Sequence, residues 1–337
     1  ITLMHDFGST VLCCTPSYAL YLADAIKDSG YPREEFQLKV GALGAEPWTE
    51  NMRHEIEEMG GKFCFRSKVT DLIFENNTLK EIEINNDKRI PAQICVLAPG
   101  HSARDTFEML QKRGVYMEPK SFAVGLRIEH PQEMINMDLY GEPENELLGA
   151  ASYKVTHKCA NGRGVYSFCM CPGGEVVAAS SERHRLVVNG MSNYARNGRN
   201  ANSALLVGVS AAELQDSHPL AGMRFQQKLE EAAFQAGGGN YYAPACCVGD
   251  FLQKHVATGC GKIEPTYRPG VNWISPDEYL PAFVTETLRL GIPAMDRKIH
   301  GFAATDAVLT GVESRSSSPV RIVRNENCES VSLAGLY

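Results

Sequence analysis

The chain has 337 residues, a length that corresponds to about two domains of ordinary size. Hydrophobic residues make up 44% and charged residues 22% of it, which excludes a collagen, a coiled coil and a disordered tail. Its 33 Lys and Arg against 40 Asp and Glu leave a net charge of −7, so we expect no nucleic-acid partner. The longest apolar run, 11–23, is interrupted at Thr15, Pro16 and Ser17, and no membrane span is predicted.

The cysteines indicate reduced thiols in a cytoplasmic protein. There are 11 of them, an odd number, and none is arranged as C-x-x-C. No charged segment followed by an apolar one marks a signal peptide, and the chain begins at Ile1 without a methionine. We therefore expect no metal site and a cytoplasmic location.

The first hundred residues predict two helices followed by short strands. An apolar stripe from Pro16 ends at Gly30, and a second helix is expected over 47–59, before Gly60 and Gly61. The hydrophobic period then changes from 3.6 to 2. Strands are expected within 62–74 and 79–84, with turns at 76–77 and 85–87, and a buried strand at 94–98. This pattern predicts an antiparallel meander that leads into one buried strand.

The strand at 94–98 passes through Pro99 and Gly100 directly into a helix. Ser102 is the expected N-cap, with Asp105 three residues later. Such a junction presents backbone N–H groups at a positive helix N-terminus, which suits an anionic or nucleotide ligand. An ordinary strand-to-helix turn is the alternative. His101 is either an acid/base group or a structural histidine.

The rest of the chain alternates strands, helices and turns. Strands are expected at 121–130, 164–174, 175–180, 185–190, 306–312, 319–325 and 330–336, and helices at 220–235 and 280–290. Three segments, 169–177, 192–204 and 237–247, are poor in charge and rich in small residues. They predict loops that wrap a flat cofactor with backbone donors, or loops that merely connect strands.

Two smaller features leave alternatives open. Cys169 and Cys171 would share one face of a strand, so they could form a reactive thiol or metal site, or simply pack in the core. Arg315 lies among hydroxyl residues and predicts either an anion-facing site or a solvated turn.

Long segments of the chain resemble an uncharacterised bacterial family of FAD-dependent dehydrogenases, whose fold is related to glutathione-reductase-type flavoproteins. Among the segments that carry the resemblance are GHSARDTFEML (100–110), GVYSFCMCPGGEVVAAS (164–180) and GVESRSSSPVRIVR (311–324). The resemblance implies an α/β (mixed α+β) fold, with a partial Rossmann-like FAD-binding domain and β-meander interrupted by an inserted α+β domain. The implied boundaries are 1–118 for the FAD-binding domain, 119–295 for an insert that covers flavin and substrate, and 296–337 for the return.

The resemblance also implies the chemistry. FAD is the expected cofactor of an oxidoreductase that transfers a hydride or two electrons, and NAD(P)H is a candidate electron donor. Val69 is expected near the adenine, and Gly100, His101 and Ser102 near the dinucleotide. Residues expected near the isoalloxazine are Cys171, Pro172, Gly173, Gly174, Arg315 and Ser318. No residue is assigned as catalytic, and the substrate, the acceptor and the oligomeric state are not assigned.

The sequence departs from the family at both ends. The strand–G-x-G-x-x-G–helix that holds a pyrophosphate is absent, since neither Gly41–Gly44 nor the glycines at 237–239 have its spacing. The chain stops at Gly335-Leu336-Tyr337, where a further glycine-rich segment is expected. We therefore expect a sequence truncated at both ends. A non-catalytic flavin- or nucleotide-binding protein, or a remnant without cofactor, is the alternative function.

Overall fold

The computed structural model describes residues 11–14, 25–32, 40–43, 50–214, 216–259 and 261–337. The chain divides into two compact units, and each is assembled from separate stretches of sequence. The first unit comprises the described residues of 1–119, with 218–220 and 320–337, and the second comprises those of 120–217 and 221–319. The return to the first unit thus lies at residue 320 rather than at the expected 296.

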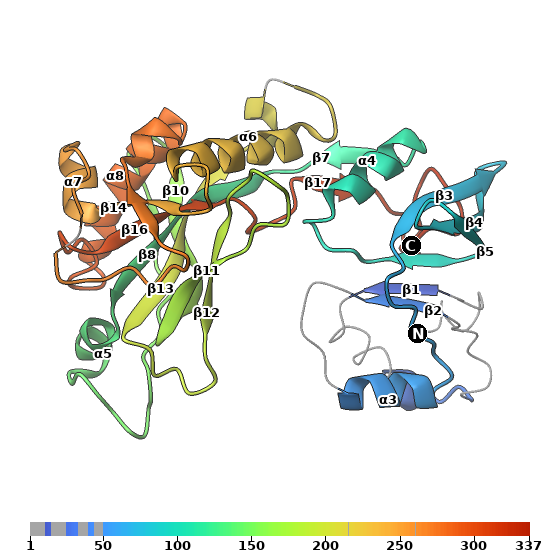
Figure 1. Ribbon diagram of the computed structural model, residues 1–337, viewed down its shortest axis with the longest axis horizontal. Helices are drawn as coiled ribbons and strands as arrows, with labels where there is room; N and C mark the ends of the chain where they lie inside the picture. The colour runs from blue at the N-terminus through green and yellow to red at the C-terminus, as the bar shows by residue number, and fades with distance from the viewer. Residues whose placement is uncertain (1–10, 15–24, 33–39, 44–49, 215, 260) are drawn as a thin grey trace. The chain divides into compact units, whose positions relative to one another are not determined.

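The first unit contains small sheets and short helices. A parallel sheet of order β2-β1-β6 is formed by β1 (Val11–Cys14), β2 (Val40–Leu43) and β6 (Cys95–Leu97). An antiparallel meander consists of β3 (Val69–Glu75), β4 (Thr78–Ile84) and β5 (Lys88–Pro91), and β7 (Met117–Pro119) pairs with β17 (Val320–Ile322). The helices of eight or more residues that the structure describes here are α3 (Glu50–Glu58) and α4 (Arg104–Lys112) (Figure 1).

The predicted meander is confirmed, and its turns explain the sequence signal. Asn76 and Asn77 have φ of 50° and 59°, and Asn85 and Asn86 have φ of 57° and 56°. Asparagine tolerates this left-handed region, which tight hairpin turns require. The helix expected from Pro16 lies largely outside the described residues, which include a helical stretch at 25–28. The strand expected at 330–336 is wrong, because these residues form turns with isolated bridges to other strands.

The second unit is built on a seven-stranded mixed sheet of order β15-β14-β16-β8-β13-β10-β9 (Figure 1). Its strands are β8 (Phe122–Pro131), β9 (Thr156–Lys158), β10 (Gly164–Cys171), β13 (Asn200–Val209), β14 (Ala243–Cys247), β15 (Val271–Trp273) and β16 (Val308–Glu313). A separate hairpin pairs β11 (Gly174–Ala178) with β12 (Val188–Ser192). The helices are α5 (Gln132–Tyr140), α6 (Ala221–Ala236), α7 (Val248–Gln253) and α8 (Ala282–Asp296), with 3-10 turns η2 (Ala211–Leu214) and η3 (Pro276–Glu278).

The two faces of the central strand β8 differ in chemistry. Because side chains alternate along a strand, Leu126 and Ile128 share one face, where they belong to the apolar core that also contains Leu288 of α8. Arg127 and Glu129 share the other face, and both are fully buried. The sheet therefore separates an apolar core from a buried polar layer.

Two segments expected to be loops contain buried strands instead. The Asn-rich segment 192–204 enters β13 at Asn200, and the segment 237–247 enters β14 at Ala243. Asn200 can lie in a buried strand because its amide donates to Glu129 Oε1 at 3.1 Å. The chain is a mixed α/β protein, which confirms the expected fold class. Among the described helices, none is long and apolar enough to cross a bilayer.

Candidate functional site

A buried arginine organises the polar layer of the second unit. The Arg127 side chain is fully buried, and its Nε donates to Glu313 Oε2 at 2.9 Å. Its Nη1 donates to the Cys169 carbonyl at 2.8 Å and to Asn202 Oδ1 at 3.0 Å, and its Nη2 donates to Asn189 Oδ1 at 2.8 Å. This one guanidinium therefore joins β8 to β10, β12, β13 and β16.

The electrostatics of this layer follow from its burial. Burial has the largest single effect and lowers the pKa of Arg127, but the charge and hydrogen bond of Glu313, together with Cys171 and Cys169, outweigh it, and the net pKa is raised. Burial raises the pKa of the Glu313 carboxyl, although Arg127 opposes the change. Burial also raises the pKa of the nearby Cys171 thiol. Cys171 is therefore a protonated thiol at neutral pH, which argues against a reactive thiolate there.

The turn that follows β10 is fixed from several sides. A bulge separates Phe168 from Cys171, so that Cys169 is exposed with φ 45° while Cys171 is buried. The expectation that the two thiols share one face is therefore wrong. The Pro172 carbonyl accepts a hydrogen bond from Ser192 Oγ at 2.7 Å. Together these contacts hold the turn 171–174 against β12.

The backbone conformation and the neighbouring loop require a glycine at position 173. Its φ is 50°, and a Cβ built there would lie 1.8 Å from the carbonyl oxygen of Arg196. Its carbonyl also accepts from the Gly198 amide at 3.0 Å. The loop 196–198 is therefore stacked directly on the turn.

Two buried amides of α5 connect the same turn to a second loop. Gln132 Oε1 accepts from the Gly173 amide at 2.7 Å, and its Nε2 donates to Asn136 Oδ1 at 2.8 Å and to the Ala151 carbonyl at 3.0 Å. Asn136 in turn donates to the Pro143 carbonyl at 2.6 Å and accepts from the Ala151 amide at 2.9 Å. The spacing of four residues places both amides on one side of α5.

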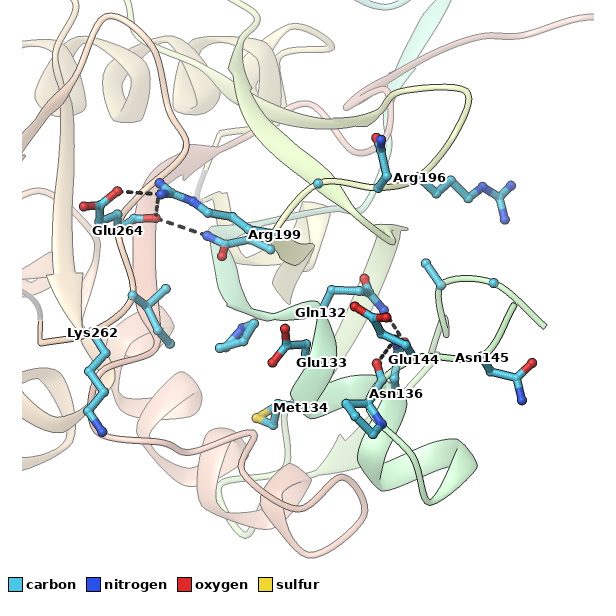
Figure 2. A pocket seen from close by; sticks show the side chains of 18 of the residues that line it. Gln132, Glu133, Met134, Asn136, Glu144, Asn145, Arg196, Arg199, Lys262 and Glu264 are labelled. Atoms are coloured by element: carbon cyan, nitrogen blue, oxygen red, sulfur yellow. Dashed lines mark hydrogen bonds and ion pairs between the residues drawn. The ribbon is translucent and has the colours of Figure 1, made fainter. Parts of the chain in front are cut away.

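These loops enclose a cavity of about 920 Å³ within the second unit. Segments 131–136, 143–150, 196–200, 262–264 and 304–306 contribute to its lining (Figure 2). This volume is typical of small-molecule sites. Because the loop 196–198 is stacked on Gly173, the predicted turn 171–174 lies directly behind one wall of the cavity.

The cavity carries charges of both signs. Arg199 is neutralised by Glu264, with Nη1 and Oε2 separated by 2.5 Å. The other charged side chains of the lining make no ion pair with any residue that the structure describes, and all but Asp306 are exposed: Glu133, Glu144, Glu146, Arg196, Lys262 and Asp306. In the view of Figure 2, Glu133 and Glu144 lie between Lys262 on one side and Arg196 on the other. The cavity can therefore offer ionic contacts to both an anion and a cation.

The structure contradicts both alternatives for Arg315. Its guanidinium is 8% exposed, and its Nη2 lies 2.8 Å from Oε2 of Glu230, which is fully buried. Its Nε donates to Glu230 Oε1 at 3.0 Å, and its Nη1 donates to Ser181 Oγ. Arg315 is therefore neither solvated nor free for an anion. Ser318 lies partly buried in the segment between β16 and β17.

The other four predicted residues lie in the first unit. Val69 begins β3 beside a cavity of about 610 Å³. Gly100 has φ 77°, and it is followed by His101 and Ser102 in a turn before α4. The expected N-cap is wrong, because Ala103 occupies that position and no side chain caps the helix there.

The carboxylate of Asp105 occupies the start of α4 instead. It accepts from the Thr106 amide at 3.0 Å, and Lys68 Nζ lies 2.5 Å from it. The Arg104 amide donates to the Ser102 carbonyl at 2.9 Å. The start of α4 therefore carries a carboxylate that is paired with a lysine.

The positions of the ten predicted residues can be compared with what FAD needs for binding. Its pyrophosphate needs free backbone amides or an uncommitted cation. Asp105 occupies the start of α4, and Glu230 neutralises Arg315, the one arginine among the ten predicted residues. Arg315, which was expected near the isoalloxazine, is therefore not an uncommitted cation for the cofactor. Among the described residues, no group of three or more His, Cys, Asp or Glu could hold a metal ion.

The sequence reasoning missed Arg127, Glu313 and Gln132. A signal for the first was present, because FAVGLRIEH places charged residues two apart in an otherwise apolar strand. That spacing puts both charges on one face of the strand. Glu313 and Gln132 gave no comparable signal, because their partners lie far away in the sequence.

Comparison with known proteins gives the family. A model of the family described as "FAD-dependent protein, C-terminal domain-like" matches residues 121–316. The chain is 47% identical over 322 residues to an uncharacterised protein of Clostridium beijerinckii, a match that covers 94% of this chain. The chain spans about 60% of the length of that relative.

Two other likenesses are partial or weak. A phenylacetate-coenzyme A ligase of Thermus thermophilus is 45% identical over 58 residues, which cover 17% of this chain and 13% of the ligase. The solved structure of the flavin-dependent brominase Bmp2 has a TM-score of 0.27 and 12% identity, over 69% of this chain and 52% of that one. A TM-score this low carries no argument about fold or function. The family model, in contrast, matches more than half of the chain, and the chain belongs to the family of FAD-dependent proteins with this C-terminal domain.

Proposed function

We propose that the chain acts in an FAD-dependent oxidoreductase of the dehydrogenase type. FAD, when bound, supplies the transfer of a hydride or two electrons between substrate and acceptor. The observation that carries the proposal is that the family match, 121–316, nearly coincides with the second unit, 120–319. That coincidence supports the second unit as the domain that faces flavin and substrate.

The remaining parts of the proposal concern partners and location. The net charge of −7 supports a small-molecule substrate rather than a nucleic acid. Free thiols support the cytoplasm as the compartment, and they are found at Cys64, Cys159, Cys169, Cys171, Cys246 and Cys328. NAD(P)H is the proposed electron donor. Gly100, His101 and Ser102 are the proposed contacts of the dinucleotide.

A flavin titration tests the proposal. The purified protein is mixed with FAD, and binding is followed by the change in flavin fluorescence and by the visible flavin bands after gel filtration. NADH or NADPH is then added without oxygen. We expect retained flavin that is bleached by one of the two nucleotides and recovers with an artificial acceptor. Protein that stays colourless with added FAD contradicts the proposal.

A matched pair of variants tests the predicted flavin contact at Ser318. Ser318→Ala is compared with Ser217→Ala, an exposed serine of the same unit. The proposal expects weaker FAD binding for Ser318→Ala only. Equal affinities would remove Ser318 from the flavin site while leaving the first titration to decide the function.

A second candidate is a non-catalytic nucleotide-binding protein or a remnant without cofactor. One observation favours it: Arg315 and the start of α4 are satisfied within the chain by Glu230 and Asp105. Flavin that binds but is not reduced by NADH or NADPH would support a binding protein. Absence of any flavin binding would support the remnant.

A further inference from the structure

The bulge at the end of β10 holds two cysteines in an unusual arrangement. Cys169 and Cys171 are separated by one residue, and the register with β13 breaks between Phe168 and Cys171. Residues 169 and 170 therefore lie outside the regular ladder of backbone hydrogen bonds. Cys169 has φ 45°, which is uncommon for a residue other than glycine. The fold thus keeps Cys169 in a conformation that costs free energy, as proteins often do at functional sites.

The two thiols are close enough to interact. The Cys171 thiol donates to the Cys169 carbonyl at 3.4 Å. Burial is the main cause of the raised pKa of Cys171, and the charge and hydrogen bonding of the Cys169 thiol add to it, against the effect of Arg127. Two residues of chain span at most about 7 Å, so the two Cα atoms lie within the separation that a disulfide tolerates.

The two thiols differ in their access to solvent. Cys169 is exposed, whereas Cys171 is only 7% exposed. A small oxidant can therefore reach Cys169 directly, while Cys171 is shielded from it. Because Cys169 is exposed, rotation about its Cα–Cβ bond can carry its sulfur toward Cys171. An accessible thiol beside a protected one is the arrangement of an attacking and a resolving cysteine.

We propose that Cys169 and Cys171 form a reversible disulfide by exchange with a disulfide of low molecular weight. The Cys169 thiolate attacks one sulfur of the small disulfide, whose S–S bond breaks, and one small thiol is released. The Cys171 sulfur then attacks the Cys169 sulfur in this mixed disulfide, and the second small thiol leaves with the proton of Cys171. The two cysteines lose two electrons, and the small disulfide is reduced to two thiols. The exchange needs no flavin and does not rest on the proposed function.

Arg127 favours the second step. Burial raises the pKa of Cys171, but the guanidinium of Arg127, whose Nη1 lies 4.0 Å from the Cys171 sulfur, opposes that rise. The negative charge that develops as Cys171 attacks is therefore next to a fixed positive charge. The same Nη1 donates to the Cys169 carbonyl at 2.8 Å. The disulfide thus forms directly beside the contact that joins β8 to β10.

Exchange with glutathione disulfide, followed by peptide mass spectrometry, tests the site. The full chain is reduced, freed of reductant and treated with millimolar glutathione disulfide, without added flavin. It is then unfolded, and the remaining thiols are blocked with maleimide. We expect the peptide that contains residues 169–171 to carry an internal disulfide in about tenfold excess over the same peptide bearing glutathione, because ring closure is intramolecular. Dithiothreitol should restore both thiols.

Two variants separate the roles of the thiols. Cys171→Ser removes the resolving thiol and should trap glutathione on Cys169, whereas Cys169→Ser should leave Cys171 as a free thiol. Cys64 and Cys328 are internal controls, because both are exposed and neither has another cysteine two residues away. Their peptides should gain glutathione without an internal disulfide.

Three outcomes would overturn the proposal. Cys169 of the unsubstituted chain could carry as much glutathione as it does in Cys171→Ser, or residues 169–171 could stay reduced while Cys64 and Cys328 react. In the third, Cys171 of the Cys169→Ser variant gains glutathione as readily as Cys169 does. Circular dichroism establishes that each variant is folded, and Cys171→Ala replaces Cys171→Ser if the buried hydroxyl unfolds the chain. Since no flavin is present, a failure here is distinct from a failure to bind FAD.

Discussion

Replacing Arg127 by methionine should destabilise the second unit more than any surface substitution. The variant removes a guanidinium that is fully buried and leaves Glu313, which is also buried, without its partner. Breaking a buried ion pair from one side costs about 3–5 kcal/mol, because the remaining charge stays desolvated. The double variant Arg127→Met/Glu313→Leu removes that charge and should cost only about 1–3 kcal/mol, mainly from the unpaired amides of Asn189 and Asn202.

The cost of Arg127→Met should also depend on pH. Burial raises the folded-state pKa of Glu313, so its contribution to stability is present at low pH and is lost as the pH rises through that raised pKa. Without Arg127, which opposes the rise, the pKa moves further upward. The variant should therefore lose more free energy of unfolding at about pH 8 than at about pH 5, where Glu313 takes up a proton.

Urea unfolding with a single fluorophore measures these values. The chain has two tryptophans, Trp48 and Trp273, and Trp273 lies in β15 of the second unit. A Trp48→Phe background leaves the fluorescence of Trp273 as the only tryptophan signal. A loss below about 1 kcal/mol, an equal loss at both pH values, or a double variant as unstable as the single one would refute the reasoning.

Three further predictions use the same protein. Gln132→Leu leaves the Gly173 amide without its acceptor and should lower the free energy of unfolding by about 1–3 kcal/mol, measured by the fluorescence of Trp273. An unchanged urea midpoint would contradict this. Gly173→Ala should lower the free energy of unfolding by about 2 kcal/mol or more, because its Cβ would lie 1.8 Å from a carbonyl oxygen. The control Gly208→Ala, whose Cβ would have nothing within 4 Å, should change it little. Equal losses of stability in the two variants would contradict the prediction. At about pH 8, maleimide should label the exposed Cys169 in the native protein, whereas Cys171, which is buried and whose pKa burial raises, should react only after unfolding. Peptide mass spectrometry identifies the labelled cysteines. Labelling of Cys171 in the native protein would disprove the prediction.

The elements that the sequence predicts correctly are those with local signals. The paired asparagines at 76–77 adopt the left-handed conformation that the hairpin turn needs. Pro219 and Gly237 bracket α6, which runs from Ala221 to Ala236. These signals act within a few residues of the structure that they specify, and tertiary packing does not alter them.

The elements that the sequence predicts wrongly depend on distant partners. Asn200 and Asn202 suggest a loop, but they lie in β13 because Glu129 and Arg127 of the neighbouring strand bond to their amides. Ser102 is a favourable N-cap by type, yet α4 begins two residues later. Local composition alone carries no information about such pairings.

The candidate site likewise combines a turn that has a local sequence signal with contacts that depend on distant residues. The turn 171–174 is recognisable from its proline and glycines, and the structure confirms a tight turn there. The glutamine that holds it, Gln132, lies 41 residues earlier, and Glu230, which neutralises Arg315, lies 85 residues before its partner. The sequence therefore indicates where the backbone bends but not which charges remain available to a ligand.

The position of β8 in its sheet also determines how the protein can be synthesised. One neighbour of β8 is β16, and Arg127 and Glu313 are 186 residues apart in the chain. While the ribosome is still translating the intervening residues, one edge of β8 remains open and its arginine lacks its carboxylate. The nascent second unit therefore cannot complete its central sheet until residues 308–313 have left the exit tunnel. Before that point, β8 is a segment that a chaperone would shield from aggregation.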